Sequence, residues 1–135
     1  MSKIYFYGLP DCTTCQKALR RLDYHRVINV KKRNIKEEPL IRAEVEKLAT
    51  MLGGAENLFS RRSPKYRELG LRDKTLSEGE MLDLMVSDYT FLKRPILIAG
   101  DEAIAGFFEK EYDAFLKANN QNTHKIKNNY ESKRN

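Results

Sequence analysis

A pair of cysteines at the start of an expected helix constrains this chain more than any other feature. The apolar and aromatic run over residues 3–7 indicates a short strand that ends at Gly8. Beyond the following loop, apolar side chains recur every three or four residues, which predicts a helix over about residues 13–24. Cys12 and Cys15, the two cysteines of the chain, therefore fall within the first turn of that helix.

The position of Cys12 favours thiol redox chemistry. Backbone N–H groups at a helix N-terminus lack intrahelical partners and carry a positive partial charge, which favours a thiolate. Cys12 is then the predicted nucleophile, with Cys15 as a resolving partner within disulfide reach. Two alternatives stay open here, namely two inert core cysteines or half of a zinc site. Zinc takes about four ligands, and His25 and His124 stand apart without a second cysteine pair, so no metal is predicted.

Length and cysteine content favour one soluble domain in a reducing compartment. A chain of 135 residues is long enough to bury a core without disulfide staples. Two neighbouring cysteines are not a disulfide framework, so we expect the cytoplasm. Residues 1–25 contain no leader-like apolar segment, and no apolar run approaches the roughly 18 residues of a membrane span, so no membrane association is expected.

The positive charge is unevenly distributed. The net charge is +6, and half of it comes from residues 118–135, which hold four basic side chains and one acidic one. This polar, basic tail has no apolar periodicity and is expected to be disordered. Interleaved aromatic residues are scarce in it, so specific nucleic-acid binding is not expected, and non-specific attraction to DNA remains an alternative. A modest basic excess suits anionic small substrates or an acidic partner equally well.

The order of the elements predicts an α/β, thioredoxin-like fold in one domain over residues 1–117. The expected elements are a strand at 3–7, a helix at 13–24, a strand at 27–30, an all-helical insertion at about 39–87 whose first helix begins near Pro39, strands at 95–99 and 103–105, and a helix at 110–117. The first three form a β-α-β unit, and the last three form a hairpin followed by a helix. The pattern β-α-β … β-β-α, with a helical insertion between its halves, is that of the thioredoxin fold.

Several motifs occur together in the chain. They are the Cys12–Cys15 pair, the stretch 61–69, the strand 92–98 that contains Lys-Arg-Pro-Ile, and the Gly-Phe pair at 106–107 before the last helix. With these motifs the chain resembles the arsenate reductase (ArsC), Spx and YffB family of thioredoxin-fold proteins, over about residues 3–117. A proline at a strand start is a candidate for either a cis or a trans bond. The resemblance implies cis at Pro95.

The resemblance also implies roles for individual residues. Cys12 is the implied redox-active cysteine, and Arg94, directly before Pro95, lines the site. The family's arginine before the short helix corresponds to Arg62 or, one residue over, to Arg61. Arginines near a thiolate stabilise it and can clamp an oxyanion or a carboxylate through two hydrogen bonds. The alternative for each arginine is an ordinary solvated surface residue.

Two departures from the arsenate reductases, and one charge beside Cys12, argue against arsenate reduction itself. The glutaredoxin-dependent enzymes of that branch have a third arginine before the last helix, where this chain has Gly106 and Phe107, as the YffB-like and Spx-like branches do. Those enzymes generally lack a cysteine at the position of Cys15. Asp11 places a negative charge beside Cys12, which opposes thiolate formation.

Two functions follow as hypotheses, and we favour the first. It is a thiol-dependent oxidoreductase with no bound cofactor, which uses glutathione or glutaredoxin as electron donor on a small oxyanion or a mixed-disulfide substrate. The alternative is an Spx-like regulator that binds the C-terminal domain of the RNA polymerase α-subunit, with a Cys12–Cys15 disulfide as its switch. Gly54 falls where that branch carries its polymerase-contacting glycine. It could equally be a glycine that ends a helix.

Overall fold

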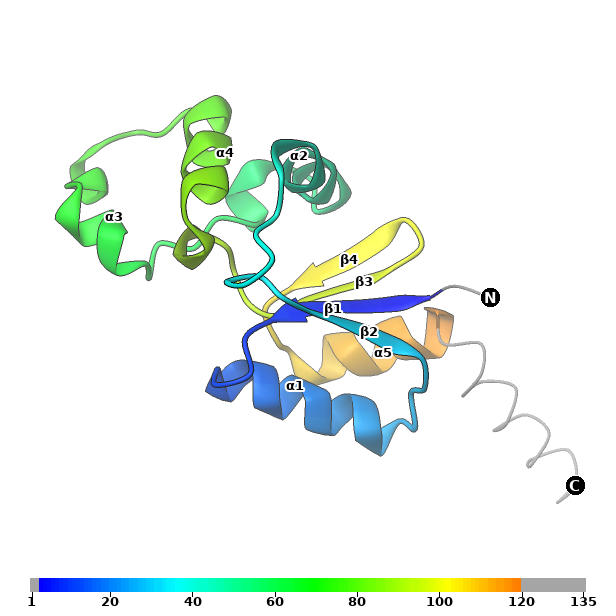
Figure 1. Cartoon of the computed structure of the whole chain (residues 1–135). Coiled ribbons are helices and arrows are strands. Elements are labelled where there is room, and N and C mark those ends of the chain that lie inside the picture. Colours follow the sequence, from blue (N-terminus) through cyan, green and yellow to red (C-terminus); the bar gives the residue numbers. More distant parts are fainter. Residues whose placement is uncertain (1–2, 120–135) are drawn as a thin grey trace, which may run out of the picture.

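The computed structural model describes residues 3–119, with a four-stranded mixed sheet at the centre (Figure 1). The strands are β1 (Ile4–Gly8), β2 (Val30–Asn34), β3 (Ile96–Ala99) and β4 (Glu102–Ala105), and they lie in the order β2-β1-β3-β4. β1 pairs in parallel with β2 and antiparallel with β3, and β3 pairs antiparallel with β4. This is the thioredoxin-like arrangement that the order of elements predicted.

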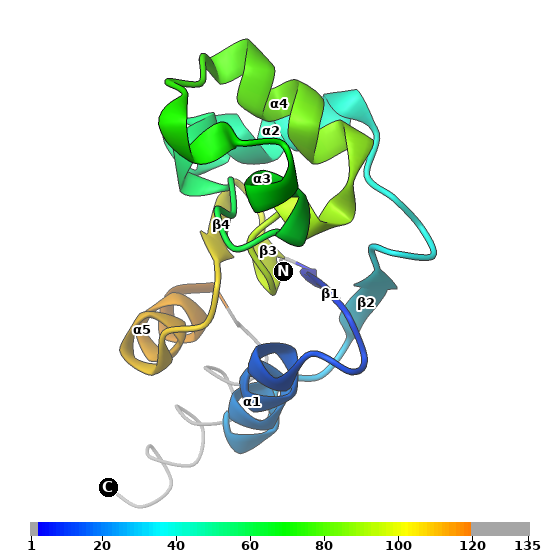
Figure 2. The ribbon, with the colours of Figure 1, turned by 90° about the vertical axis from the view of Figure 1, so that its left-hand side faces the viewer.

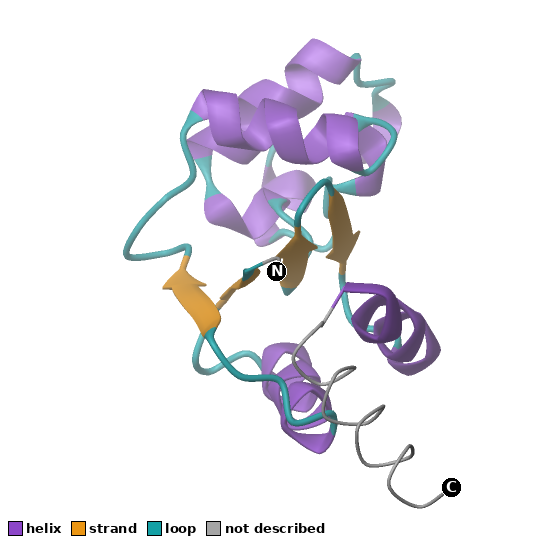
Figure 3. Ribbon diagram, turned by 90° about the vertical axis from the view of Figure 1, so that its right-hand side faces the viewer, coloured by secondary structure: helices purple, strands orange, loops and turns teal. Residues whose placement is uncertain are grey.

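Helices lie on both sides of the sheet (Figures 2 and 3). They are α1 (Thr13–Tyr24), α2 (Arg42–Met51), α3 (Pro64–Glu68), α4 (Glu78–Ser87) and α5 (Glu109–Asn119), with short 3-10 turns at Ala55–Asn57, Leu71–Asp73 and Tyr89–Phe91. α1 and α5 lie beneath one face, and α2, α3 and α4 gather on the other side (Figure 1). All described regular elements between β2 and β3 are helical, which confirms the predicted helical insertion.

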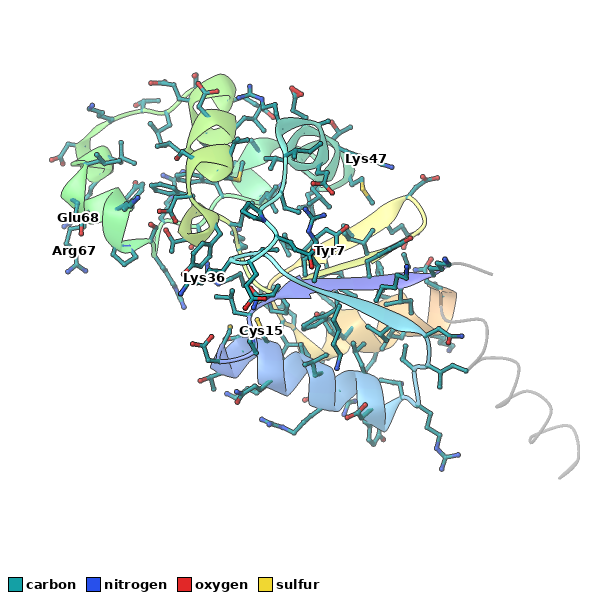
Figure 4. All side chains as sticks on the ribbon, in the orientation of Figure 1. Tyr7, Cys15, Lys36, Lys47, Arg67 and Glu68 are labelled. Carbon is teal, nitrogen blue, oxygen red and sulfur yellow. The ribbon has the colours of Figure 1, made fainter. Side chains whose placement is uncertain are left out.

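Successive side chains along β1 point to opposite faces of the sheet, and each face packs against its own hydrophobic core. Ile4 and Phe6 are buried beneath the sheet with α1 and α5, in the cluster that also contains Cys15. Tyr5 and Tyr7 are half-buried on the side of α2, and Figure 4 shows Tyr7 and Cys15 on opposite sides of the sheet. Each fully buried large apolar side chain contributes about 1.5–3 kcal/mol to the stability of the fold. The lower core, beneath the sheet, is therefore the apolar support on which the cysteine pair rests.

An upper core lies between the helical insertion and the other face of the sheet. It includes Val45 and Leu48 of α2, and Phe59 and Phe91 from the segments that flank α3 and α4. The two phenylalanine rings stack, with centroids 5.5 Å apart and planes inclined by 8°. This packing ties the insertion to the segment that leads into β3.

The second strand begins later than the sequence predicted. It was expected at residues 27–30, but β2 runs from Val30 to Asn34. Arg26 and Asn29 have positive φ angles of 56° and 62°, so the chain is still turning there. The lysines of β2 are tolerated in a strand because β2 is at the edge of the sheet, where charged side chains reach water.

The first helix of the insertion also begins later than predicted. It was expected from Pro39, but α2 begins at Arg42, because Ile41 has an extended backbone with φ −85° and ψ 166°. The Glu44 carboxylate accepts the Ile41 N–H at 3.0 Å, and Arg33 donates to both Glu44 oxygens at 2.6 and 3.1 Å. Arg33 also donates to the Pro39 carbonyl at 2.9 Å, which holds this proline outside the helix.

The last helix extends slightly beyond its predicted range. α5 ends at Asn119, so residues 118 and 119 are helical rather than part of a disordered tail. The remainder of the predicted tail, 120–135, lies outside the described residues. Within residues 3–119, no helix is both long enough and apolar enough to cross a membrane.

Candidate thiol site

Cys12 is the N-cap residue of α1. Its backbone is extended, with φ −84° and ψ 120°, and its sulfur accepts a hydrogen bond from the Cys15 N–H at 3.3 Å. Its carbonyl accepts the Gln16 N–H at 2.9 Å, which begins the helical ladder. The Cys12 side chain is half-buried. The N–H that points at the sulfur favours negative charge there, and the partial exposure leaves the sulfur open to a substrate.

Cys15 lies behind Cys12 and is fully buried. It is 0% exposed and packs with Ala18 and Leu22 in the lower core. Burial is the main cause that raises the pKa of the Cys15 thiol to about 12; the neighbouring Cys12 adds to the rise, and the Arg94 charge acts against it. Cys15 is therefore a neutral thiol near pH 7, and the accessible sulfur of the pair is that of Cys12.

Gly8 makes room for the Cys15 sulfur, a role that the sequence analysis missed. A Cβ atom at Gly8 would lie 2.8 Å from Cys15 Sγ, which is closer than such atoms approach in folded proteins. In the sequence, Gly8 stands where a strand is expected to end. A glycine at that place fits both roles, and the sequence pattern alone does not separate a turn from a close approach.

Arg94 and Pro95 border the cysteine pair at the start of β3. The peptide bond between them is cis, as the resemblance implied, and Pro95 is buried. The Arg94 guanidinium donates through Nη1 to the carbonyls of Tyr89 and Leu92, at 3.3 and 3.2 Å. Its buried Nε has no hydrogen-bond partner among the described residues. Arg94 is close enough to Cys15 for its charge to act on that thiol, so one unpaired donor lies beside the site.

The segment that carries the other two arginines is paired with the segment that leads to Arg94. Phe59 and Leu92 form an isolated antiparallel bridge, flanked by hydrogen bonds from the Ser60 N–H to the Phe91 carbonyl at 2.7 Å and from the Lys93 N–H to the Leu58 carbonyl at 2.9 Å. Segments more than 30 positions apart in sequence are thereby held side by side. The structure thus brings the stretch around residues 58–63 to the approach of β3.

A polar network fixes the same junction. Ser63, the buried N-cap of α3, shares a hydrogen bond with the Thr90 hydroxyl at 2.7 Å. The Asp88 carboxylate accepts from the Thr90 N–H at 2.8 Å and forms an ion pair with Lys65 at 2.8 Å. Although burial acts to raise the pKa of Asp88, the hydrogen bonds from Lys65 and Thr90 bring it down to about 2.

Arg61 and Arg62 are both exposed, and neither donates a hydrogen bond to a cysteine in the described structure. Arg61 donates to the Tyr66 hydroxyl at 3.1 Å and lies over the rings of Phe59 and Tyr66. The Arg62 side chain has no hydrogen bond or ion pair within residues 3–119, which leaves its guanidinium available to a ligand. Of the three predicted arginines, Arg94 is the one with a direct electrostatic link to the cysteine pair.

Tyr112 of α5 packs in the same buried cluster as Cys15, a placement that was not predicted from the sequence. Its ring is 0% exposed and packs edge-on against Phe107, with centroids 4.8 Å apart. Its hydroxyl is buried without a hydrogen-bond partner among the described residues. Burial raises the pKa of Tyr112 well above its usual range, and the charge of a Cys15 thiolate would raise it further. A buried aromatic residue on a helix gives no sequence signal that it shares its cluster with a cysteine.

Gly54 lies at the end of α2, away from regular strand structure. Its N–H donates to the Ala49 carbonyl at 2.8 Å, and the Gly53 N–H donates to Thr50 at 3.1 Å, which together close the helix in a Schellman motif. Gly54 has a φ angle of 143°, and a Cβ there would meet no atom within 4 Å. Gly54 therefore takes part in ending α2, and the space that a side chain there would occupy is open.

Within residues 3–119, no three His, Cys, Asp or Glu side chains gather closely enough to hold a metal ion. The site instead consists of a cysteine pair at a helix N-terminus, a cis-proline and an arginine. On a mixed sheet with the order β2-β1-β3-β4, this arrangement defines the class of thioredoxin-fold thiol proteins.

Comparison with known proteins narrows the class. The chain matches the model of the ArsC family over residues 7–115, and it belongs to that family. It is 34% identical to YusI of Bacillus subtilis over 111 residues, which cover 80% of this chain and 93% of that protein. It is also 34% identical to the global transcriptional regulator Spx of Streptococcus pneumoniae over 108 residues, 79% of this chain and 80% of Spx. Among solved structures, an ArsC-family-related protein from Bacteroides fragilis superimposes with a TM-score of 0.75 at 27% identity, over 83% of this chain and 96% of that one.

Proposed function

We propose that this protein is a thiol–disulfide oxidoreductase in which Cys12 is the nucleophile and Cys15 the resolving thiol. The observation that carries the proposal is the contrast within one helical turn. Cys12 is partly exposed and receives a backbone hydrogen bond at its sulfur, whereas Cys15 is 0% exposed directly behind it. A reductase of this type needs one thiol that meets the substrate and one that is shielded until the first has reacted.

The reaction proceeds by thiol–disulfide exchange. The Cys12 thiolate attacks one sulfur of a substrate disulfide, forms a mixed disulfide and releases the other half as a thiolate. Cys15 then attacks the Cys12 sulfur and its proton passes to the second half, which leaves as a thiol, so two electrons pass from the cysteine pair to the substrate. Two molecules of glutathione, or a glutaredoxin, reduce the Cys12–Cys15 disulfide again. Glutathione is in this way a co-substrate, and the reducing cytoplasm is the compartment that supplies it.

The arginines would bind the anionic part of the substrate. The unengaged Arg62 guanidinium is a donor suited to a carboxylate or an oxyanion, and Arg94, whose buried Nε is unpaired, adds positive charge beside the site. Arg61 is less available to a substrate than Arg62, because its guanidinium already donates to the Tyr66 hydroxyl. The cis-proline at Pro95 supports the strand start beside which an extended substrate would lie.

The test is turnover of a glutathionylated peptide with glutathione as reductant. Cys12→Ser is expected to abolish reduction. In a single reaction without added glutathione, Cys15→Ser should accumulate a mixed disulfide at Cys12 that intact mass measurement detects. Thr14→Ser, at an exposed position of the same helical turn, is the matched control and should keep full activity. Reduction that survives Cys12→Ser would rule the proposal out.

A second candidate function rests on the relatives named Spx. In that reading the Cys12–Cys15 disulfide is a redox switch, and the open surface at Gly54 meets the C-terminal domain of the RNA polymerase α-subunit. A pull-down with that domain, under reducing and oxidising conditions, separates the two candidates. Binding that depends on the redox state and is lost in Gly54→Arg supports the regulator. Absence of binding in both states removes it.

A further inference from the structure

The helix that begins at Cys12 leads into a basic groove that the thiol chemistry itself does not use. The groove has a volume of about 280 Å³ and is lined by Lys17, Arg20, Arg21 and Tyr24 of α1, and by Phe107 and Glu109 at the start of α5. α1 and α5 run side by side beneath the sheet, as Figures 1 and 2 show. Three cations and two aromatic rings therefore face one space along the seam between these helices.

Two of the three cations are uncompensated. Arg21 donates to both Asp113 oxygens at 2.8 Å and lies 3.5 Å from a Glu109 oxygen, so its charge is neutralised within the fold. Within residues 3–119, Lys17 and Arg20 form no ion pair or side-chain hydrogen bond, and both are exposed. Tyr24 is 70% exposed, with the Arg21 guanidinium stacked 4.2 Å from the ring centroid. The groove thus presents a net positive charge beside apolar ring surface.

The groove begins one to two helical turns beyond the thiol site. Lys17 is five residues after Cys12, which is about 7.5 Å along a helix that rises about 1.5 Å per residue. On the other wall, Phe107 follows Gly106, whose N–H donates to the Pro95 carbonyl at 2.7 Å. The Phe107 wall of the groove therefore lies close to the cis-proline, a separation that a few residues of extended chain can span.

We infer that this groove binds an acidic segment with an aromatic residue on a polypeptide substrate, next to the disulfide that Cys12 attacks. The inference rests on the proposed oxidoreductase function and names its substrate class. Negative side chains of the substrate pair with Lys17 and Arg20, and its aromatic side chain packs on Tyr24 and Phe107. Asp11 places a negative charge beside Cys12, and apolar Phe107 lies near Pro95. The groove therefore takes the acidic side chains further along the polypeptide, whereas Arg62 and Arg94 serve the part of the substrate at the thiol.

The experiment compares two peptides of equal length, each with one cysteine held as a mixed disulfide with glutathione. One peptide carries flanking Glu and Phe residues, and the other carries Lys and Phe. The native protein is expected to reduce the acidic peptide about tenfold faster at low ionic strength, with the ratio falling as salt is added. The double variant Lys17→Glu/Arg20→Glu should bring the ratio to one or below.

The matched control is Lys32→Glu/Lys47→Glu, which changes the net charge equally at exposed positions on β2 and α2. It should keep the preference for the acidic peptide. Equal rates for both peptides in the native protein, or a preference lost equally in both double variants, would overturn the inference.

A binding measurement separates this inference from the proposed function. Fluorescently labelled versions of the peptides with alanine in place of cysteine cannot react, so their affinities report the groove alone. Tighter binding of the acidic peptide by about tenfold, lost in Lys17→Glu/Arg20→Glu, supports the groove even if no reduction is seen, and in that case the oxidoreductase function alone fails. Reduction without any difference in binding or rate overturns the groove alone.

Discussion

The upper and lower regions of the molecule differ in whether their buried polar groups are hydrogen-bonded. In the upper region, the Ser63 hydroxyl is 5% exposed and bonded to Thr90, which in turn is bonded to Asp88. The Tyr112 hydroxyl in the lower core and Arg94 Nε at the start of β3 are the two buried side-chain polar atoms within residues 3–119 that lack a hydrogen bond. Both residues lie close enough to Cys15 for charge on one to act on the other. An unpaired buried polar group costs about 1–3 kcal/mol. Unsatisfied groups are thus concentrated at the thiol pair, where chemistry can use them.

The largest effect expected from this contrast is in thiol reactivity. Iodoacetamide at pH 8 should modify Cys12 at least about a thousandfold faster than Cys15, because a thiol with a pKa near 12 holds about one part in ten thousand as thiolate there. Peptide mapping by mass spectrometry measures both rates. Unfolding in urea should make the two rates similar, which serves as the control. Comparable rates in the folded protein would contradict the buried position of Cys15.

Gly8→Ala sharpens the comparison by disturbing the lower core alone. The added methyl group would lie 2.8 Å from Cys15 Sγ, and we expect a loss of about 2–3 kcal/mol in the free energy of unfolding, measured in urea. Gly79→Ala in α4 is the matched control, because a Cβ there meets nothing within 4 Å. That change should stabilise the protein by about 0.5–1 kcal/mol. In a Cys15→Ala background, Gly8→Ala should cost clearly less, and an unchanged cost would show that the clash is not with the sulfur.

The same two regions show how much of the molecule could be predicted from sequence. The order of elements followed from local periodicity, and the cysteine pair and the Lys-Arg-Pro-Ile strand are contiguous motifs, so the fold and the candidate residues near Cys12 were accessible. The closeness of Gly8 and Tyr112 to Cys15 was not, because it depends on packing between segments that are distant in sequence. The start of β2 was misplaced because positive φ angles at Arg26 and Asn29, neither a glycine, leave no sequence pattern.

Loss of the Asp88 charge at low pH should lower the free energy of unfolding more than loss of the Asp113 charge beneath the sheet. The pKa of Asp88 is about 2 in the fold against about 3.9 in an unfolded chain, so its stabilising contribution is complete above about pH 4 and is lost as the pH falls toward 2. The Asp88 side chain is 15% exposed and its partner Lys65 54% exposed, so after solvent screening we expect about 1–2 kcal/mol. Urea unfolding of Asp88→Asn between pH 2 and 6 should show a correspondingly weaker pH dependence.

Asp113 provides the comparison within the lower region. Hydrogen bonds from Arg21 and His25 lower its pKa to about 2, and its contribution is lost over the same pH window. Its side chain is 35% exposed, so screening is stronger, and Asp113→Asn should remove less of the acid dependence than Asp88→Asn does. The reverse order would show that exposure does not decide which ion pair stabilises the fold.

The smallest effect, and the most direct test of the contrast, comes from deleting one hydroxyl in each region. Ser63→Ala removes the bond to Thr90 and the N-cap bond to the Lys65 N–H, and should cost about 1–2 kcal/mol. Tyr112→Phe removes a hydroxyl that has no partner within residues 3–119, so the free energy of unfolding should stay within about 0.5 kcal/mol or rise by up to about 1 kcal/mol. Equal losses in the two variants would mean that the Tyr112 hydroxyl is hydrogen-bonded in solution. The unpaired groups would then not be a feature that distinguishes the thiol site from the rest of the molecule.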